Sequence, residues 1–281
     1  MARFRWILPV LSVAGALVCA GQIVQWSLMG AWPFHDTVAY WLAGRHLLEG
    51  APVYTSGLFL AFLYAPPWAI LWAPISLLPI DLVVAGLLIL QVLALRYVVG
   101  SWVAVGLVAW IPFVPRELAT GNVDFLMAAA ILAGIRGSGG PISLFAFAKF
   151  SPALVLLGGS RRQWRTALVA GVALVAITLP WWHLWVDWVA MLLSNPEGGD
   201  SVVPLIVRLP IVVALLAVRR PWALAAGAAL LTPAFHFHSV VLLLPAAILL
   251  MESLRDPARP TADHAFAPIG EREIEEPSRA A

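Results

Sequence analysis

WILPVLSVAGALVCAGQIVQWSLM, residues 6–29, is an apolar run without a single charged residue. A helix needs about 20 mainly apolar residues to cross the hydrocarbon core of a bilayer. A secretory signal has a shorter apolar core, about 7–15 residues, followed by a small-residue cleavage site. No convincing cleavage site follows this longer run. We therefore expect residues 6–29 to form an uncleaved first membrane helix.

The composition extends this expectation to most of the chain. Of its 281 residues, 62% are hydrophobic and 11% are charged, and the mean hydropathy is +0.90. A soluble domain carries about 25% charged residues. The apolar segments are continuous rather than alternating, which favours helices over the strands of a barrel. We expect an all-α fold, a polytopic transmembrane helical bundle.

The sequence excludes a fold or metal site built on cysteines, and it excludes a nucleic-acid-binding protein. The single Cys19 allows no disulfide framework and no cysteine metal site within one chain. No basic run is long enough to indicate binding of nucleic acid.

Apolar segments recur along residues 1–252, which we expect to form one transmembrane domain of about ten spans. The segments are 6–29, 60–79, 82–99, 101–116, 122–136, 140–158, 164–182, 202–218, 221–236 and 238–252. Basic residues mark the cytoplasmic side, and four clusters fall on one face of this scheme: Arg3 and Arg5; Arg161, Arg162 and Arg165; Arg219 and Arg220; Arg255 and Arg259. Both termini are then cytoplasmic. The charged residues 253–281 are expected to form a disordered cytoplasmic tail.

Two polar segments, 30–60 and 183–201, lie on the outer side in this scheme. Residues 36–49 predict a short amphipathic helix on the membrane surface, with Gly50 as its stop signal. Its expected apolar contacts are made by Val38, Trp41, Leu42 and Leu48. The second segment holds tryptophans suited to the membrane interface.

Asp36 and Lys149 are the first candidates for chemistry. A carboxylate directly after the first span suits a general base that removes a proton from an acceptor hydroxyl; the alternative is a helix N-cap. Lys149 precedes Pro152 inside an apolar segment, where a broken helix can line a cavity. A buried lysine needs an anion, either a phosphate ligand or a neighbouring carboxylate. The alternative is a lysine that extends to the interface.

His236, His238, Arg208 and Asp124 complete the candidates. Histidine can donate to a phosphate, although both histidines also suit an ordinary interfacial position. Arg208 lies inside an apolar segment, where its planar guanidinium suits an anion. Asp124 opens a span and is explained by capping.

Several ordered motifs from residue 30 to residue 250 resemble glycosyltransferase family 87, in the GT-C superfamily. They are HDTVAYWLAG (35–44), LEGAPVY (48–54), YAPP (64–67), AP (73–74) with LP (78–79), GNVD (121–124), KFSPA (149–153), RRQW (161–164), DS (200–201) with Arg208, and TPAFHFH (232–238). Walker, GxGxxG, HExxH and nucleophile-elbow motifs are absent from the sequence.

The resemblance implies a GT-C-like fold and a mannosyltransferase of the bacterial plasma membrane. Such an enzyme transfers mannose from polyprenyl phosphate to a lipid or glycan acceptor at the outer face, with inversion. The resemblance places the base on Asp36 and the donor-phosphate contact on His238. Further phosphate-binding candidates are His236, Lys149 and Arg208, and the substrate-binding candidates are Tyr40, Tyr54, Tyr64 and Asn122. No metal and no cofactor are expected. Two other functions stay open, a transporter or flippase of an anionic lipid and a non-catalytic membrane scaffold.

Overall fold

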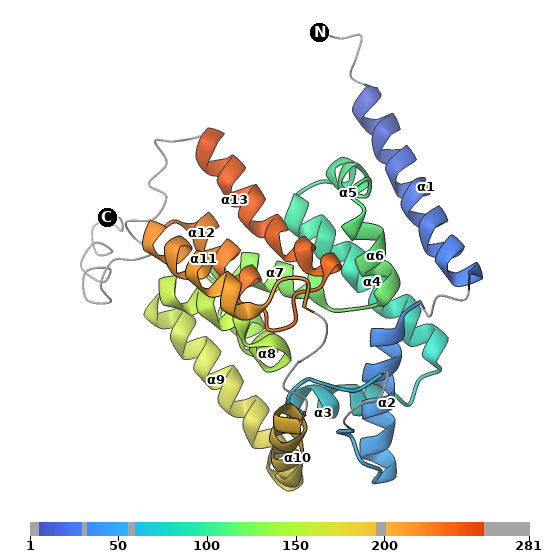
Figure 1. The fold of residues 1–281 in the computed structure, drawn as a ribbon, viewed down its shortest axis with the longest axis vertical. Coiled ribbons are helices and arrows are strands. Elements are labelled where there is room, and N and C mark those ends of the chain that lie inside the picture. Colours follow the sequence, from blue (N-terminus) through green and yellow to red (C-terminus); the bar gives the residue numbers. More distant parts are fainter. Residues whose placement is uncertain (1–5, 30–32, 56–59, 195–200, 256–281) are drawn as a thin grey trace, which may run out of the picture.

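The computed structural model describes residues 6–29, 33–55, 60–194 and 201–255, and every regular element within these ranges is a helix. The predicted all-α class is confirmed (Figure 1). The helices are α1 (Ile7–Leu28), α2 (His35–Glu49), α3 (Pro66–Ile75), α4 (Ile80–Val99), α5 (Trp102–Val108), α6 (Phe113–Thr120), α7 (Asp124–Ile135), α8 (Gly140–Lys149), η2 (Ser151–Gly158), α9 (Arg161–Thr178), η3 (Leu179–Trp181), α10 (His183–Ser194), α11 (Leu205–Val218), α12 (Pro221–Leu230), η4 (Phe237–Leu243) and α13 (Leu244–Arg255). The basic Arg3 and Arg5, the loop 195–200 and the predicted tail beyond residue 255 lie outside the described residues.

Within the described ranges, four helical segments are long and apolar enough to cross a membrane. They are α1, α4, α9 with η3, and η4 with α13; α5 and α6 together make a fifth, although they meet at 97°. The outer faces of α1 and α9 are apolar and exposed: Leu17 is 68% exposed and Val169 69%. Such faces are stable against lipid chains rather than water.

The prediction of ten spans is not confirmed. Each remaining expected span does contain a helix, but α3, α7, α11 and α12 have only 10, 12, 14 and 10 residues. At the rise of an α-helix they reach about 15–21 Å, against about 30 Å of hydrocarbon core. Apolar composition alone did not reveal where these helices end.

The expected span 140–158 is broken at the residue after Lys149. The α-helix α8 ends at Lys149, and the 3₁₀ helix η2 begins at Ser151. Pro152 has no backbone N–H to continue an α-helix, and its ring is tolerated in the first turn of a new one. The sequence prediction of a helix opened by Pro152 is confirmed, and the break leaves Lys149 at a helix end.

The helix α2 matches the predicted amphipathic helix, but its inner face differs from the expected one. It ends at Gly50, which adopts the left-handed conformation (φ 69°). Its buried residues are Thr37, Ala39, Tyr40, Ala43 and Gly44. Leu48, expected in apolar contact, is 51% exposed. α2 packs on α3 through its small residues, since a Cβ on Gly44 would lie 2.4 Å from the Trp72 carbonyl oxygen.

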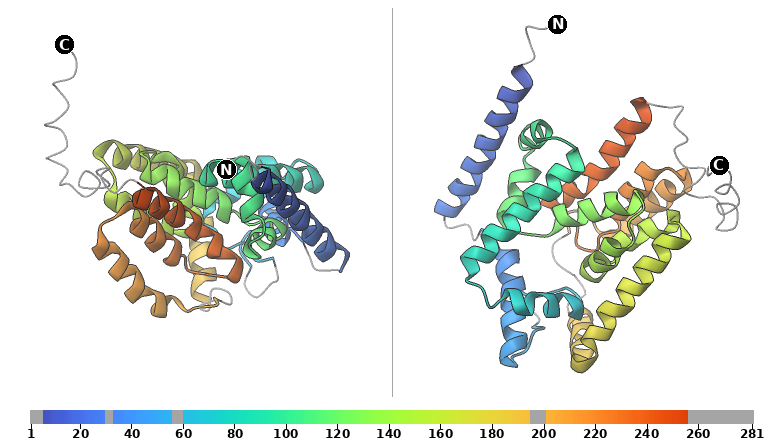
Figure 2. Two further views of the ribbon diagram at one scale, coloured as in Figure 1. Left: turned by 90° about the horizontal axis from the view of Figure 1, so that it is seen from above. Right: turned by 180° about the vertical axis from the view of Figure 1, so that it is seen from behind.

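The turn between α6 and α7 ties α2 to the centre of the molecule. Gly121 ends α6 with a φ of 69°, a conformation that costs L-residues energy. Its carbonyl accepts a hydrogen bond of 3.0 Å from the buried Thr37 hydroxyl. The main apolar core joins residues of α2, α3, α4, α7, α8 and α12. Figure 2 shows α2, α3 and α10 together at one end of the molecule, and the candidate site lies there.

Candidate functional site

A cavity of about 330 Å³ lies where α2, the end of α8, α10 and the loop before η4 meet. Among the residues that line it are Asp36, Tyr40, Tyr64, Asn122, Lys149, His236 and His238. These are all sequence-predicted site residues, and they come from segments up to about 200 positions apart in the chain. Arg208 and Tyr54 do not line this cavity. One wall is apolar and includes Leu63, Phe150, Trp188, Met191 and Leu192. The cavity therefore combines a polar, charged side with a surface suited to hydrocarbon.

Asp36 lies in the first turn of α2 but does not cap the helix. The N-cap position is held by Phe34, and no side chain caps this helix end. The Asp36 side chain is 30% exposed, and its Oδ1 lies 3.6 Å from the Nε2 of His35. The structure thus gives no support to the capping explanation, and the carboxylate is directed to the cavity.

Burial, more than the neighbouring charges, determines the direction in which the pKa of Asp36 is shifted. Burial raises the pKa of Asp36, and the nearby carboxylate of Asp124 raises it further. The opposing charges of His35, Lys149 and His236 lower it by less, so the net direction is upward. A carboxylate with a raised pKa is a stronger base once it is ionised.

Lys149 forms an ion pair with Asp124 across the break that ends α8. The Lys149 Nζ lies 2.5 Å from Oδ1 of Asp124, and their side chains are 10% and 0% exposed. The sequence left open whether a phosphate or a carboxylate balances Lys149, and the structure shows a carboxylate. Capping was the wrong explanation for Asp124, because Val123 is the N-cap of α7 and no side chain caps that helix.

Tyr40, Tyr64 and Asn122 form one hydrogen-bonded group on the cavity wall. The hydroxyls of Tyr40 and Tyr64 donate to Asn122 Oδ1 over 3.0 and 3.1 Å and lie 2.9 Å apart. Burial raises the pKa of both phenols, so both keep their protons. Tyr54 lies behind this group, and its hydroxyl donates to the backbone carbonyl of Tyr64 over 2.9 Å. Tyr54 thus supports the wall and lines a neighbouring cavity with Asp187.

Arg208 holds backbone rather than facing the cavity. The residue is 2% exposed, and its guanidinium donates to backbone carbonyls. The accepting carbonyls belong to Val203, Leu230, Thr232 and Pro233, at 2.8, 2.5, 2.6 and 3.0 Å. The expected direct contact of Arg208 with phosphate has no counterpart in this geometry. Instead Arg208 fixes the loop that leads to His236.

His236 and His238 lie on the same side of that loop. Their rings are stacked, with centroids 5.3 Å apart and an angle of 18° between the planes. A regular helix would direct residues i and i+2 to different faces, but His236 is extended (ψ 167°) and η4 begins only at Phe237. Both imidazoles can therefore face one ligand.

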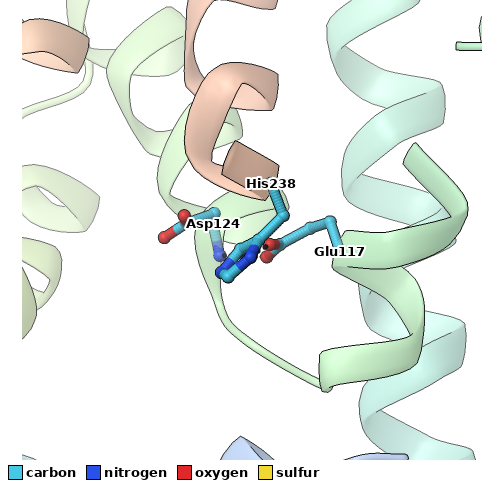
Figure 3. A group of neighbouring side chains, drawn as sticks. All are labelled: Glu117, Asp124 and His238. Carbon is cyan, nitrogen blue, oxygen red and sulfur yellow. Dashed lines mark hydrogen bonds and ion pairs between the residues drawn. The ribbon is translucent and has the colours of Figure 1, made fainter. Parts of the chain in front are cut away.

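Glu117 is a site residue that the sequence analysis missed. It lies on α6, is 0% exposed, and its Oε1 accepts a hydrogen bond of 3.1 Å from the backbone N–H of Asp124. Its Oε2 lies 3.8 Å from Nε2 of His238, and Figure 3 shows the two side chains next to each other with Asp124. The available signal was its position between two apolar segments, where an ionisable residue requires a partner.

Comparison with known proteins adds no identification. No protein-family model matches the chain, and no curated protein or solved structure is significantly similar to it. The resemblance to glycosyltransferase family 87 stays a prediction. The functional argument therefore rests on the residues gathered in the cavity.

Proposed function

We propose that this protein is a membrane glycosyltransferase that transfers mannose from polyprenyl phosphate to a hydroxyl of a lipid or glycan acceptor. The observation that carries the proposal is that Asp36, His236 and His238 share one cavity with an apolar wall. The carboxylate suits a base, the imidazoles suit a phosphate, and the wall suits a prenyl chain. The proposal that the sugar is mannose comes from the motifs that resemble glycosyltransferase family 87.

The reaction is a single displacement at the anomeric carbon. Asp36 takes the proton of the acceptor hydroxyl as that oxygen attacks the anomeric carbon from the face opposite the phosphate. The bond from the anomeric carbon to the phosphate oxygen breaks, and polyprenyl monophosphate leaves with the electron pair. The product has the inverted configuration. Imidazole N–H groups of His236 and His238 donate to the departing phosphate, where the negative charge grows.

Tyr40, Tyr64 and Asn122 are proposed to contact the sugar. Their hydroxyl and amide groups form a neutral polar surface beside Asp36, which suits sugar hydroxyls. Lys149 is proposed to act through its field on the donor phosphate, since its direct partner is Asp124. Arg208 and Tyr54 position the residues that face the substrate.

The topology remains part of the proposal. We place the cavity at the outer face of a bacterial plasma membrane, both termini in the cytoplasm, and the ten helical segments in a GT-C-like arrangement. The helices that are too short to cross alone then surround the cavity, because irregular backbone at membrane depth is tolerated where it lines a cavity.

The test is a transfer assay with purified protein. Polyprenyl-phosphate-[radiolabelled mannose] and a membrane lipid extract are supplied to the wild type, Asp36→Asn and Asp81→Asn. Asp81 is a matched control, because it lies in the first turn of α4 and does not line the cavity. Loss of a general base costs about 10²–10⁴-fold in rate, so Asp36→Asn should lose activity to that extent while Asp81→Asn keeps it. Equal transfer by wild type and Asp36→Asn contradicts the role of Asp36. No transfer by the wild type with mannosyl, glucosyl or arabinosyl donors contradicts the proposed function and leaves a transporter or a scaffold.

A further inference from the structure

The cavity region has too little positive charge for the anionic ligand that it is proposed to bind. Lys149 is the one lysine or arginine among the described residues that line the cavity. Its ammonium is already paired with Asp124 at 2.5 Å. A departing phosphate needs a cation or several oriented donors. The histidines supply donors, but no second lysine or arginine lines the described part of the cavity.

Glu117, Asp124 and His238 come together at the side of this cavity. One ligand atom of each lies within 4.8 Å of the other two. The three residues are 0%, 0% and 9% exposed, and they come from α6, the start of α7 and η4 (Figure 3). Carboxylate oxygens and imidazole nitrogens are common metal ligands in proteins.

The free atoms of this group are a second observation. Glu117 Oε2, Asp124 Oδ2 and His238 Nε2 are buried and have no hydrogen-bond partner among the described residues. Burying a polar group without a partner is unfavourable, so such atoms are rare unless a ligand or water satisfies them. The three atoms belong to residues that each have one ligand atom within 4.8 Å of the others.

Each carboxylate is held by one oxygen and leaves the other free. Glu117 Oε1 accepts from the Asp124 backbone N–H at 3.1 Å, and Asp124 Oδ1 accepts from Lys149 at 2.5 Å. Metal sites have this pattern, in which an outer contact orients a ligand whose second atom binds the ion.

We propose that Glu117, Asp124 and His238 bind one divalent cation, and that Mn²⁺ fits the site best. Two carboxylates favour the hard ions Mg²⁺ and Mn²⁺, while the imidazole favours softer ions than Mg²⁺. Two neighbouring ligands of one such ion lie about 3 Å apart, so Glu117 Oε2 and His238 Nε2, now 3.8 Å apart, would close by less than an ångström. The role of the ion rests on the proposed function: it supplies positive charge that attracts the departing lipid phosphate, and His238 then acts through the ion.

The test measures the ion alone. Wild-type protein is stripped with EDTA and titrated with MnCl₂ while the electron paramagnetic resonance signal of free Mn²⁺ is followed, with MgCl₂ and ZnCl₂ as competitors. The expected result is saturable uptake of one ion per chain. Loss of even an outer partner weakens metal sites about 10–100-fold, so Glu117→Gln and His238→Gln should weaken binding at least tenfold. Asp36→Asn, in the same cavity, and Glu252→Gln, in the exposed pair with Arg136, should bind as wild type does.

The outcomes separate the ion site from the enzyme. The absence of saturable Mn²⁺, Mg²⁺ or Zn²⁺ binding by the folded wild type overturns the ion site, whatever the variants do. Binding that survives in Glu117→Gln and in His238→Gln overturns it as well. If Mn²⁺ binds at this site but no sugar is transferred, the ion site stands and the transferase fails. If transfer proceeds unchanged in EDTA and no ion binds, the transferase stands and the ion site fails.

Discussion

The buried pair of Lys149 and Asp124 should be strongly coupled in stability. Lys149→Met removes the ammonium and leaves the Asp124 carboxylate, 0% exposed, without its partner at 2.5 Å. Breaking a buried ion pair on one side costs about 3–5 kcal/mol. For a chain of this size, that lowers the apparent unfolding temperature by an amount on the order of 10 °C. The double variant Asp124→Asn/Lys149→Met removes both charges and should regain at least half of the loss.

A matched control is the exposed pair Arg136 and Glu252. Their side chains are 44% and 48% exposed at an N–O distance of 3.1 Å, so Arg136→Met should cost less than about 1 kcal/mol. The assay is unfolding of detergent-purified protein followed by tryptophan emission, for which the chain offers 14 tryptophans. The reasoning is refuted if Lys149→Met costs no more than Arg136→Met. It is also refuted if the double variant shows no recovery, because the coupling energy would then be zero.

Four further outcomes follow from the site. Because burial raises the pKa of Asp36, its ionisation at neutral pH lowers the stability of the fold, and this stability is regained as the pH falls. Asp36→Asn should therefore unfold at a higher temperature than wild type at pH 7, and at the same temperature below the ordinary aspartate pKa of about 3.9. A difference in unfolding temperature that does not change with pH would contradict this. For the same reason, the acidic limb of the transfer rate against pH should lie above that ordinary value, and a limb at or below it would remove Asp36 as the titrating base. Arg208→Gln should lose about 3 kcal/mol or more through unsatisfied buried carbonyls, and a variant as stable as wild type would show that these contacts are dispensable. Tyr64→Phe should lose about 0.5–1.5 kcal/mol with its hydrogen bond to Asn122, measured by the same unfolding assay, and a gain in stability would argue against that bond.

The sequence predicted the class of fold, and seven of its candidate site residues line the cavity. Motif residues such as Asp36 and His238 were named without knowing that they meet, and the structure brings them into one cavity. The break after Lys149 followed from Pro152 alone, because proline limits helix continuation whatever the tertiary contacts.

The helix ends and side-chain partners that the sequence did not predict depend on tertiary contacts. Hydropathy does not show that α3 stops after 10 residues, because Leu77, Leu78 and Pro79 continue the apolar run after Ser76. Arg208 looked like an anion ligand, but its acceptors are backbone carbonyls, and those of Leu230 and Thr232 lie more than 20 residues away in the chain. Glu117 was overlooked because neither of its partners is evident from the sequence. His238 is distant in the chain, and Asp124 reaches Glu117 only after the sharp turn between α6 and α7.

The 97° angle between α5 and α6 has a consequence for how the protein is made. The two limbs have 7 and 8 residues, far fewer than the run of about 20 that can enter a bilayer as one rod. To enter the bilayer, α5 and α6 need a protein surface that is already in the membrane and on which they can pack. The helix α1 offers this surface, since its Leu11 carbonyl accepts a hydrogen bond of 2.9 Å from the Trp110 indole. Because α1 leaves the ribosome before α5 and α6, the order of synthesis suits this assembly. A chain lacking the first 29 residues should therefore be inserted with Glu117 misplaced, even though no residue of the cavity has been removed.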